Sequence, residues 1–151
     1  MGNVALIIGL FLFLFGLVFG LVGIISKRRA AASLQWPTAS GQILSSMIHT
    51  ITSTDNDGGT TTSYEPKVEY SYAVMGSPMN GSRIAFGAMG SDYKSAQKIL
   101  ARYPVGAAVE VRYNPEKPSE TVLETSARGA TLFTVLGIIF MVVGIVVALL
   151  L

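Results

Sequence analysis

VALIIGLFLFLFGLVFGLVGII, residues 4–25, is an unbroken run of apolar residues and glycine. An equally long run at residues 130–151, ATLFTVLGIIFMVVGIVVALLL, has two threonines as its only polar residues. About 20 consecutive apolar residues cross the roughly 30 Å hydrocarbon core of a bilayer. All 11 basic and all 9 acidic side chains lie between Lys27 and Arg128. Both runs are therefore predicted to be transmembrane helices, because the region between them is too small to bury two such helices.

The first run is expected to be an uncleaved anchor. It has no basic segment before it, and it is longer than the roughly 7–15 apolar residues of a signal peptide. Only 13% of the residues are charged, against about a quarter in soluble domains. The chain has no cysteine, which excludes disulfides, thiolate metal sites and cysteine nucleophiles.

The basic residues next to the two runs predict which way the chain faces. Lys27, Arg28 and Arg29 follow the first run and Arg128 precedes the second. The positive-inside rule then places the middle region in the cytoplasm and both termini outside. An extracytoplasmic middle is the alternative, since long loops can be translocated whatever their charge. Apart from these four, seven basic side chains face nine acidic ones, so no nucleic-acid partner is expected. Membrane lipid is the expected partner of the four basic residues.

Small residues recur every seven positions in both apolar runs, and such stripes let membrane helices pack closely. The two stripes are predicted to pair antiparallel within one chain, although contact with another protein, or with a second copy, fits equally well. Neither run contains a charged residue, which argues against transport by this chain alone. The predicted helix-packing residues are Gly9, Gly16, Gly20 and Gly23 in the first run and Ala130, Gly137 and Gly144 in the second.

Alternating residues predict a small antiparallel β domain between the helices. Val68, Tyr70, Tyr72 and Val74 are separated by Lys67, Glu69, Ser71 and Ala73, the pattern of a half-buried strand. Residues 53–63 are predicted to form a mobile polar loop. Further strands are predicted at 42–52, around 82–86, at 107–115 and at 120–124, with a helix after Ser91 as N-cap and Asp92.

The predicted fold class is thus a membrane α + β protein. Two transmembrane helices flank a small antiparallel β barrel or sandwich, in the order three strands, one helix and two strands. An OB-like barrel is one form that this order can take. The expected divisions are 1–35 for the first helix with a cytoplasmic extension, 36–126 for the β domain and 127–151 for the second helix.

Trp36, the only tryptophan, is followed by Pro37. Because a proline disfavours helical backbone at the residue before it, the first helix is predicted to end here. Trp36 is expected either to anchor at the membrane surface or to plug the base of the β domain, and Gly41 is expected to start the first strand. We interpret Trp36, Pro37 and Gly41 as a structural joint.

Three motifs lie between the two apolar runs: W-P-x-x-x-G at residues 36–41, Y-x-P-x-V-x-Y-x-Y at 64–72, and Y-P-x-G-x-x-V-x-V-x-Y-x-P-x-x-P at 103–118. The chain resembles a bacterial membrane-protein family catalogued only as a domain of unknown function. The resemblance implies a membrane helix at each end and the bacterial inner membrane. One departure is Met79, where an aromatic residue is expected two positions before Gly81. The family carries no assigned activity.

The middle region contains no recognisable catalytic pattern. His49 is the only histidine, so a zinc site is not expected. Asp55 and Asp57 do not form a twelve-position calcium loop. We therefore expect no enzyme activity, no metal and no cofactor. The leading hypothesis is a non-catalytic, membrane-anchored interaction or scaffold protein, or an accessory subunit of a membrane complex. The alternative is a membrane-tethered sensor that binds a ligand through the tyrosine-rich strands and the 53–63 loop.

Overall fold

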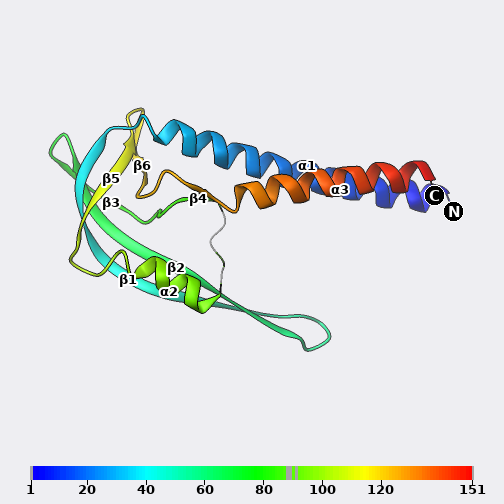
Figure 1. Ribbon diagram of the computed structural model, residues 1–151, viewed down its shortest axis with the longest axis horizontal. Coiled ribbons are helices and arrows are strands. Elements are labelled where there is room, and N and C mark those ends of the chain that lie inside the picture. Colours follow the sequence, from blue (N-terminus) through cyan, green and yellow to red (C-terminus); the bar gives the residue numbers. More distant parts are fainter. Residues whose placement is uncertain (1, 88–89, 91, 151) are drawn as a thin grey trace.

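The computed structural model describes residues 2–87, 90 and 92–150 of the chain. Two long helices, α1 (Gly2–Ser33) and α3 (Ala130–Leu150), run antiparallel and side by side (Figure 1). The β domain lies at the end of this pair where α1 ends and α3 begins. The predicted arrangement of two helices flanking an antiparallel β region is confirmed.

Both helices are long and apolar enough to cross a membrane, over Val4–Ser33 and Ala130–Leu149. Only 22% and 11% of their most apolar windows are buried, whereas a core helix of a soluble protein is mostly buried. Their outward side chains are leucine, isoleucine, valine and phenylalanine. Contiguous apolar surface of this kind marks contact with a membrane or with another protein.

A five-stranded antiparallel sheet forms most of the β domain, in the order β3-β2-β1-β5-β6. A second, two-stranded sheet joins β4 and β7 in parallel. Helix α2 (Tyr93–Leu100) packs on β1 and β2. The strands are β1 (Thr38–Thr54), β2 (Thr60–Val74), β3 (Ser77–Gly81), β4 (Phe86–Gly87), β5 (Ala108–Asn114), β6 (Lys117–Val122) and β7 (Ala127–Arg128).

The sheet curls, but it does not close into a barrel. Within the described residues, the backbone hydrogen bonds between the two edges lie beyond the ends of β3 and β6. There Leu123 N–H donates to the Arg83 carbonyl at 3.2 Å, and Glu124 N–H donates to the Ile84 carbonyl at 2.7 Å. The domain is therefore an open, sandwich-like β structure, and the closed form of the predicted OB-like barrel is not realised.

The core lies on one face of the curled sheet. Val68, Tyr70, Tyr72 and Val74 on β2 are all buried, as their alternation predicts. Ile43, Ile84, Tyr103 and Val111 complete the cluster, and Met79 packs against it from β3.

The third strand lies earlier than predicted. It spans Ser77–Gly81, whereas 82–85 is irregular. Met75 and Gly76 have positive φ angles of 50° and 82°, the backbone conformation of a tight hairpin turn. This turn brings Ser77 opposite Val74 directly. The prediction was displaced because Pro78 and Asn80 are poor strand residues in sequence terms.

The predicted mobile loop at 53–63 is mostly paired strand. The register of β1 and β2 continues to Thr54 opposite Thr60, which extends the hairpin beyond the rest of the sheet (Figure 1). Threonine is a good strand former, and the remaining turn is tied by Gly59 N–H to Asp55 Oδ1 at 2.6 Å.

Two further details differ from the sequence prediction. The N-cap of α2 is Asp92, whose carboxylate accepts hydrogen bonds from the Ser95 hydroxyl at 2.6 Å and the Ser95 N–H at 3.0 Å. These bonds hold the pKa of Asp92 below its ordinary value. Ser91, the predicted cap, lies outside the described residues. Gly41 lies inside β1, which begins at Thr38. A Cβ at Gly41 would lie 2.6 Å from the Ser71 carbonyl oxygen, so this position needs glycine for close packing.

Candidate functional site at the junction of the helices and the β domain

The glycines of α1 face the small residues of α3 in register. A Cβ added at Gly9 would lie 2.6 Å from the Gly144 carbonyl oxygen, and one at Gly16 would lie 2.6 Å from the Gly137 carbonyl oxygen. Real Cβ atoms do not approach that closely, so the two backbones touch because side chains are absent. We call this contact the glycine seam; it consists of Gly9, Gly16, Gly20, Gly23, Ala130, Gly137 and Gly144.

Gly20 takes a different part in the seam from Gly16. A Cβ at Gly20 would meet only the Met141 Cε, at 3.9 Å. The close approach there comes from the other helix, since a Cβ at Gly137 would lie 2.5 Å from the Gly20 nitrogen. Phe15, Phe19 and Phe140 pack beside the seam in tilted and edge-to-face pairs, with ring centroids 4.6–6.5 Å apart.

Trp36 lies between the end of α1 and the β domain. Its ring packs on Phe86 with centroids 6.1 Å apart and an interplanar angle of 75°. Ala30 of α1, Phe86 and Val122 form a buried cluster to which Trp36 and Ala127 add. In this position the indole is half-buried against a cluster that joins α1 to the β domain.

Hydrogen bonds to backbone carbonyls hold the same joint. Arg112 Nη1 donates to the carbonyls of Leu34 and Trp36, at 3.3 Å each. Tyr113 N–H donates to the Pro37 carbonyl at 3.1 Å. The chain that leaves α1 is therefore clamped to β5 directly after the helix ends.

A second joint forms around Glu124, just before α3. Glu124 Oε1 accepts a hydrogen bond from the Tyr103 hydroxyl at 2.7 Å and lies 2.9 Å from Arg102 Nη1. Its other oxygen accepts a bond from Arg128 Nη2 at 2.6 Å. Arg128, predicted as a basic membrane-flanking residue, is thus also a structural partner that ties the start of α3 to the β domain.

The electrostatics of this cluster follow from its contacts. Burial alone would raise the pKa of the Glu124 carboxyl. The hydrogen bonds from Tyr103 and Arg128, and the charges of Arg128 and Arg102, outweigh burial and leave the pKa of Glu124 below its ordinary value. For Tyr103 the effects add, because burial and the hydrogen bond to Glu124 both raise the pKa of the phenol.

Another cluster of charged side chains surrounds Glu120. Arg29 Nη1 and Arg83 Nη1 lie 3.9 and 3.6 Å from the same Glu120 oxygen. Lys27 and Arg28 are exposed on α1. Arg29 is exposed as well, but its guanidinium lies next to Glu120 of the β domain.

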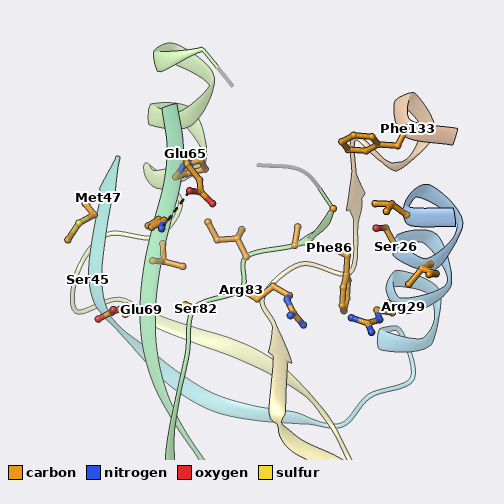
Figure 2. Close-up of a pocket in the computed structure, with 18 residues that line it drawn as sticks. Ser26, Arg29, Ser45, Met47, Glu65, Glu69, Ser82, Arg83, Phe86 and Phe133 are labelled. Atoms are coloured by element: carbon orange, nitrogen blue, oxygen red, sulfur yellow. Dashed lines mark ion pairs between the residues drawn. The ribbon is translucent and has the colours of Figure 1, made fainter. Parts of the chain in front are cut away.

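A cleft of about 800 Å³ lies between α1, the start of α3 and the β domain. Arg29 and Arg83 enter it from facing segments, with Phe86 and Phe133 nearby (Figure 2). On the strand side, Met47 and Glu69 point away from the helices. The helix side of the cleft consists of Val22, Ile25, Ser26, Arg29 and Phe133, and segment 82–87 forms its floor.

Residues 39–128 match the family described as Domain of unknown function (DUF3592). The chain belongs to this family. The DUF3592 match runs from the second residue of β1 to the end of β7, so it covers the β domain, Arg83, Glu120 and Glu124. Trp36 and the whole of α1 and α3 lie outside it. No curated protein matches the chain.

Among the described residues, no group of three or more histidines, cysteines, aspartates or glutamates could hold a metal ion. Sequence reasoning missed Arg83, Glu120 and Glu124. Each stands in a segment read only as strand or turn, and the distances that join Arg29 to Arg83 and Glu124 to Tyr103 exist only in the folded chain.

Proposed function

We propose that this protein is a non-catalytic, membrane-anchored interaction protein, either a scaffold or an accessory subunit of a complex in the bacterial inner membrane. The observation that carries the proposal is the pairing of α1 and α3. The glycine seam joins the helices to each other and leaves their large apolar side chains facing outward. Two joints then fix this pair to the β domain.

We place the β domain in the cytoplasm, with α1 and α3 each crossing the membrane once. Lys27, Arg28, Arg29 and Arg128 all lie at the end of the helix pair next to the β domain, which supports this orientation. A single cysteine at Asn56, on the β1–β2 turn, tests it in a chain with no native cysteine. An impermeant thiol reagent should leave Asn56→Cys unlabelled in intact cells and label it after lysis. Labelling in intact cells would reverse the orientation.

The outer edge of β1 is the surface that we assign to a protein partner or a second copy. Within the described residues, β1 pairs with β5 only over 38–42, although it continues to Thr54. Leu44 and Ile51 are exposed on this stretch. An unpaired strand edge offers free N–H and C=O groups to an added strand.

Purification of the full chain at native abundance in mild detergent tests the proposal. A stable partner or a homo-oligomer should elute with the chain. The double variant Leu44→Lys/Ile51→Lys should release it. Val105→Lys, which also places a lysine at an exposed apolar position, serves as the matched control and should retain the partner. A wild-type chain that elutes as a monomer alone would contradict the proposal.

A ligand-binding sensor is the second candidate, and the 800 Å³ cleft favours it. The cleft lies between the helices and the β domain, so an occupant would contact both. Ligand binding there should raise the melting temperature of the full chain in detergent. A thermal-shift screen that finds no stabilising compound or lipid would count against the sensor.

A further inference from the structure

We propose that the cleft binds one anionic phospholipid, with its phosphate between Arg29 and Arg83 and an acyl chain along Val22, Ile25 and Phe133. The inference rests on the proposed insertion of α1 and α3 into a membrane. It adds a specific lipid site to that function.

The apolar part of the cleft lies at the end of the membrane-length run. Val22 and Ile25 stand on the last apolar turns of α1, and Phe133 stands on the first turn of α3. Arg29 follows one turn beyond Ile25. A helix that crosses the bilayer passes from hydrocarbon to headgroups over this distance. The cleft therefore presents apolar side chains at acyl-chain depth and guanidinium groups at phosphate depth.

Both arginines have hydrogen-bonding capacity to spare. Their distances of 3.9 and 3.6 Å to Glu120 exceed the 2.7–2.9 Å or so of a charge-assisted hydrogen bond. A guanidinium carries about five N–H donors in a planar fork that matches phosphate geometry. The side chains are 57% and 43% exposed, so an added anion can reach them.

The charge around this point is positive. Lys117, Arg29 and Arg83 share a neighbouring polar hollow of about 350 Å³ with Glu120 as its only carboxylate. The carboxylates on the strand side of the cleft are engaged or turned away. Glu65 pairs with Lys67 at 3.6 Å, and Glu69 points away from α1 (Figure 2). In the cleft itself Arg29, Arg83 and Lys67 face Glu65 and Glu69. Both spaces therefore have more cations than carboxylates, which favours a headgroup with net negative charge over a zwitterionic one.

The folded chain fixes the backbone positions of Arg29 and Arg83 before any ligand arrives. Arg83 is fixed through its carbonyl, which accepts bonds from the Tyr70 hydroxyl at 3.0 Å and Leu123 N–H at 3.2 Å. Its guanidinium lies 5.5 Å from the centre of the Phe86 ring. Arg29 is carried by α1. Preorganised groups lose less conformational freedom on binding.

Native mass spectrometry of the full chain in detergent tests the site with two lipids of identical acyl chains. Phosphatidylglycerol should bind at least about tenfold more tightly than phosphatidylcholine, given the positive charge of the site. Arg29→Gln/Arg83→Gln should remove that preference. Lys27→Gln/Arg28→Gln removes the same charge from the same end of the chain, but neither residue lines the cleft. This control should keep the preference, and circular dichroism should show both variants folded.

Several results would overturn the inference. One is equal binding of the two lipids by the wild type. Another is an equal loss of the preference for phosphatidylglycerol in Arg29→Gln/Arg83→Gln and in the control, which would indicate unspecific attraction to charge. Inorganic phosphate and glycerol phosphate form a further arm. If either displaces phosphatidylglycerol at comparable concentration, the site binds a soluble anion and not a lipid. If the chain shows no preference for phosphatidylglycerol but still co-purifies with its partner, only this inference is overturned. If the chain does not fractionate with membranes, the proposed function itself is overturned.

Discussion

At the scale of single residues, Glu124 is a carboxylate that contacts Tyr103, Arg102 and Arg128 just before α3. Its replacement by glutamine removes the charge that Arg102 and Arg128 face, at 2.9 and 2.6 Å. We expect Glu124→Gln to lower the free energy of unfolding by about 1.5–3 kcal/mol, the range for hydrogen bonds to charged groups. Denaturant unfolding in detergent, followed by tryptophan fluorescence, measures the loss. Glu116→Gln, at an exposed turn position, is the control and should leave the unfolding midpoint unchanged.

The same residue gives the protein an acid dependence. The pKa of Glu124 is lower in the folded chain than its ordinary value, so its stabilising contribution is present above pH ~4.3, the unfolded value. The contribution falls away as the pH drops through the folded pKa. Between about pH 5 and 2 the wild type should therefore lose more stability than Glu124→Gln. Parallel stability curves for the two proteins would contradict this assignment.

Tyr70 provides the corresponding alkaline test. Burial raises its pKa to about 12 despite its hydrogen bond with Thr121. Because the folded pKa lies above the unfolded value of about 10, the neutral phenol stabilises the fold below pH ~10. That stability is lost as the pH rises toward the folded value. Tyr70→Phe should cost about 1 kcal/mol at neutral pH and should show a flatter decline at alkaline pH.

Phenolate absorbance checks the assignment to Tyr70 directly. Burial also raises the pKa values of Tyr72 and Tyr103, so the wild type should show a late phase from several phenols, and Tyr70→Phe should reduce the amplitude of that phase by one phenol. Tyr93→Phe, at a position 53% exposed, is the matched loss of one hydroxyl and should retain the phase. A late phase that survives in Tyr70→Phe with undiminished amplitude would refute the assignment.

At the scale of elements, the glycine seam predicts opposite outcomes for two neighbouring glycines. Gly16→Ala would place a Cβ 2.6 Å from the Gly137 carbonyl oxygen, and overpacking of this kind costs about 1–3 kcal/mol. Gly20→Ala meets only a flexible methionine end at 3.9 Å. It should be neutral or stabilise by up to about 1 kcal/mol, since alanine is the better helix former. Melting temperatures of the two variants in one detergent provide the comparison. Equal destabilisation would mean that α1 and α3 pack through other residues.

Elements with a local repeat could be predicted from the sequence. The alternation around Tyr70 defines β2 and its buried face, and the uniform apolar runs define α1 and α3. Elements set by backbone pairing could not. Strand β3 contains Pro78, and the hairpin arm is threonine and serine with no buried face, so neither produces a periodic pattern. Backbone pairing with β2 determines where β3 and the hairpin arm lie.

At the scale of the whole molecule, the candidate site could not be read from the chain. Arg29 was identified as one of three equivalent basic residues, but only the fold turns it toward Arg83 and Glu120. Those partners lie 54 and 91 positions away in sequence, and no local signal links them. The joint at Trp36 was easier to predict, because Pro37 disfavours helical backbone at the residue before it. Its contact with Phe86 still required the folded structure.

The helix pair holds the β domain through contacts on both connecting segments. Trp36 and Arg112 fix the chain after α1, and Glu124 fixes the chain before α3. With the cysteine-free background, spin labels at Ala31→Cys and Thr61→Cys report the distance between α1 and the β1–β2 arm. Trp36→Ala should broaden the distance distribution, because the Phe86 contact is lost while the sheet itself is untouched. It should also cost about 1–3 kcal/mol, below the 3–5 or so of a fully buried aromatic, since Trp36 is only half-buried.

Trp36→Phe is the matched control, because it keeps a ring against Phe86 and should keep a narrow distribution. If Trp36→Ala is as narrow as the wild type, the two polar joints are sufficient and the indole only fills space. The double variant Trp36→Ala/Glu124→Gln should then have a broader distance distribution than either single variant. It lacks the Phe86 contact after α1 and the Glu124 charge before α3. A rigid connection matters for either proposed function, because an occupant of the cleft or a partner on β1 can influence the helices only if the β domain does not rotate freely on them.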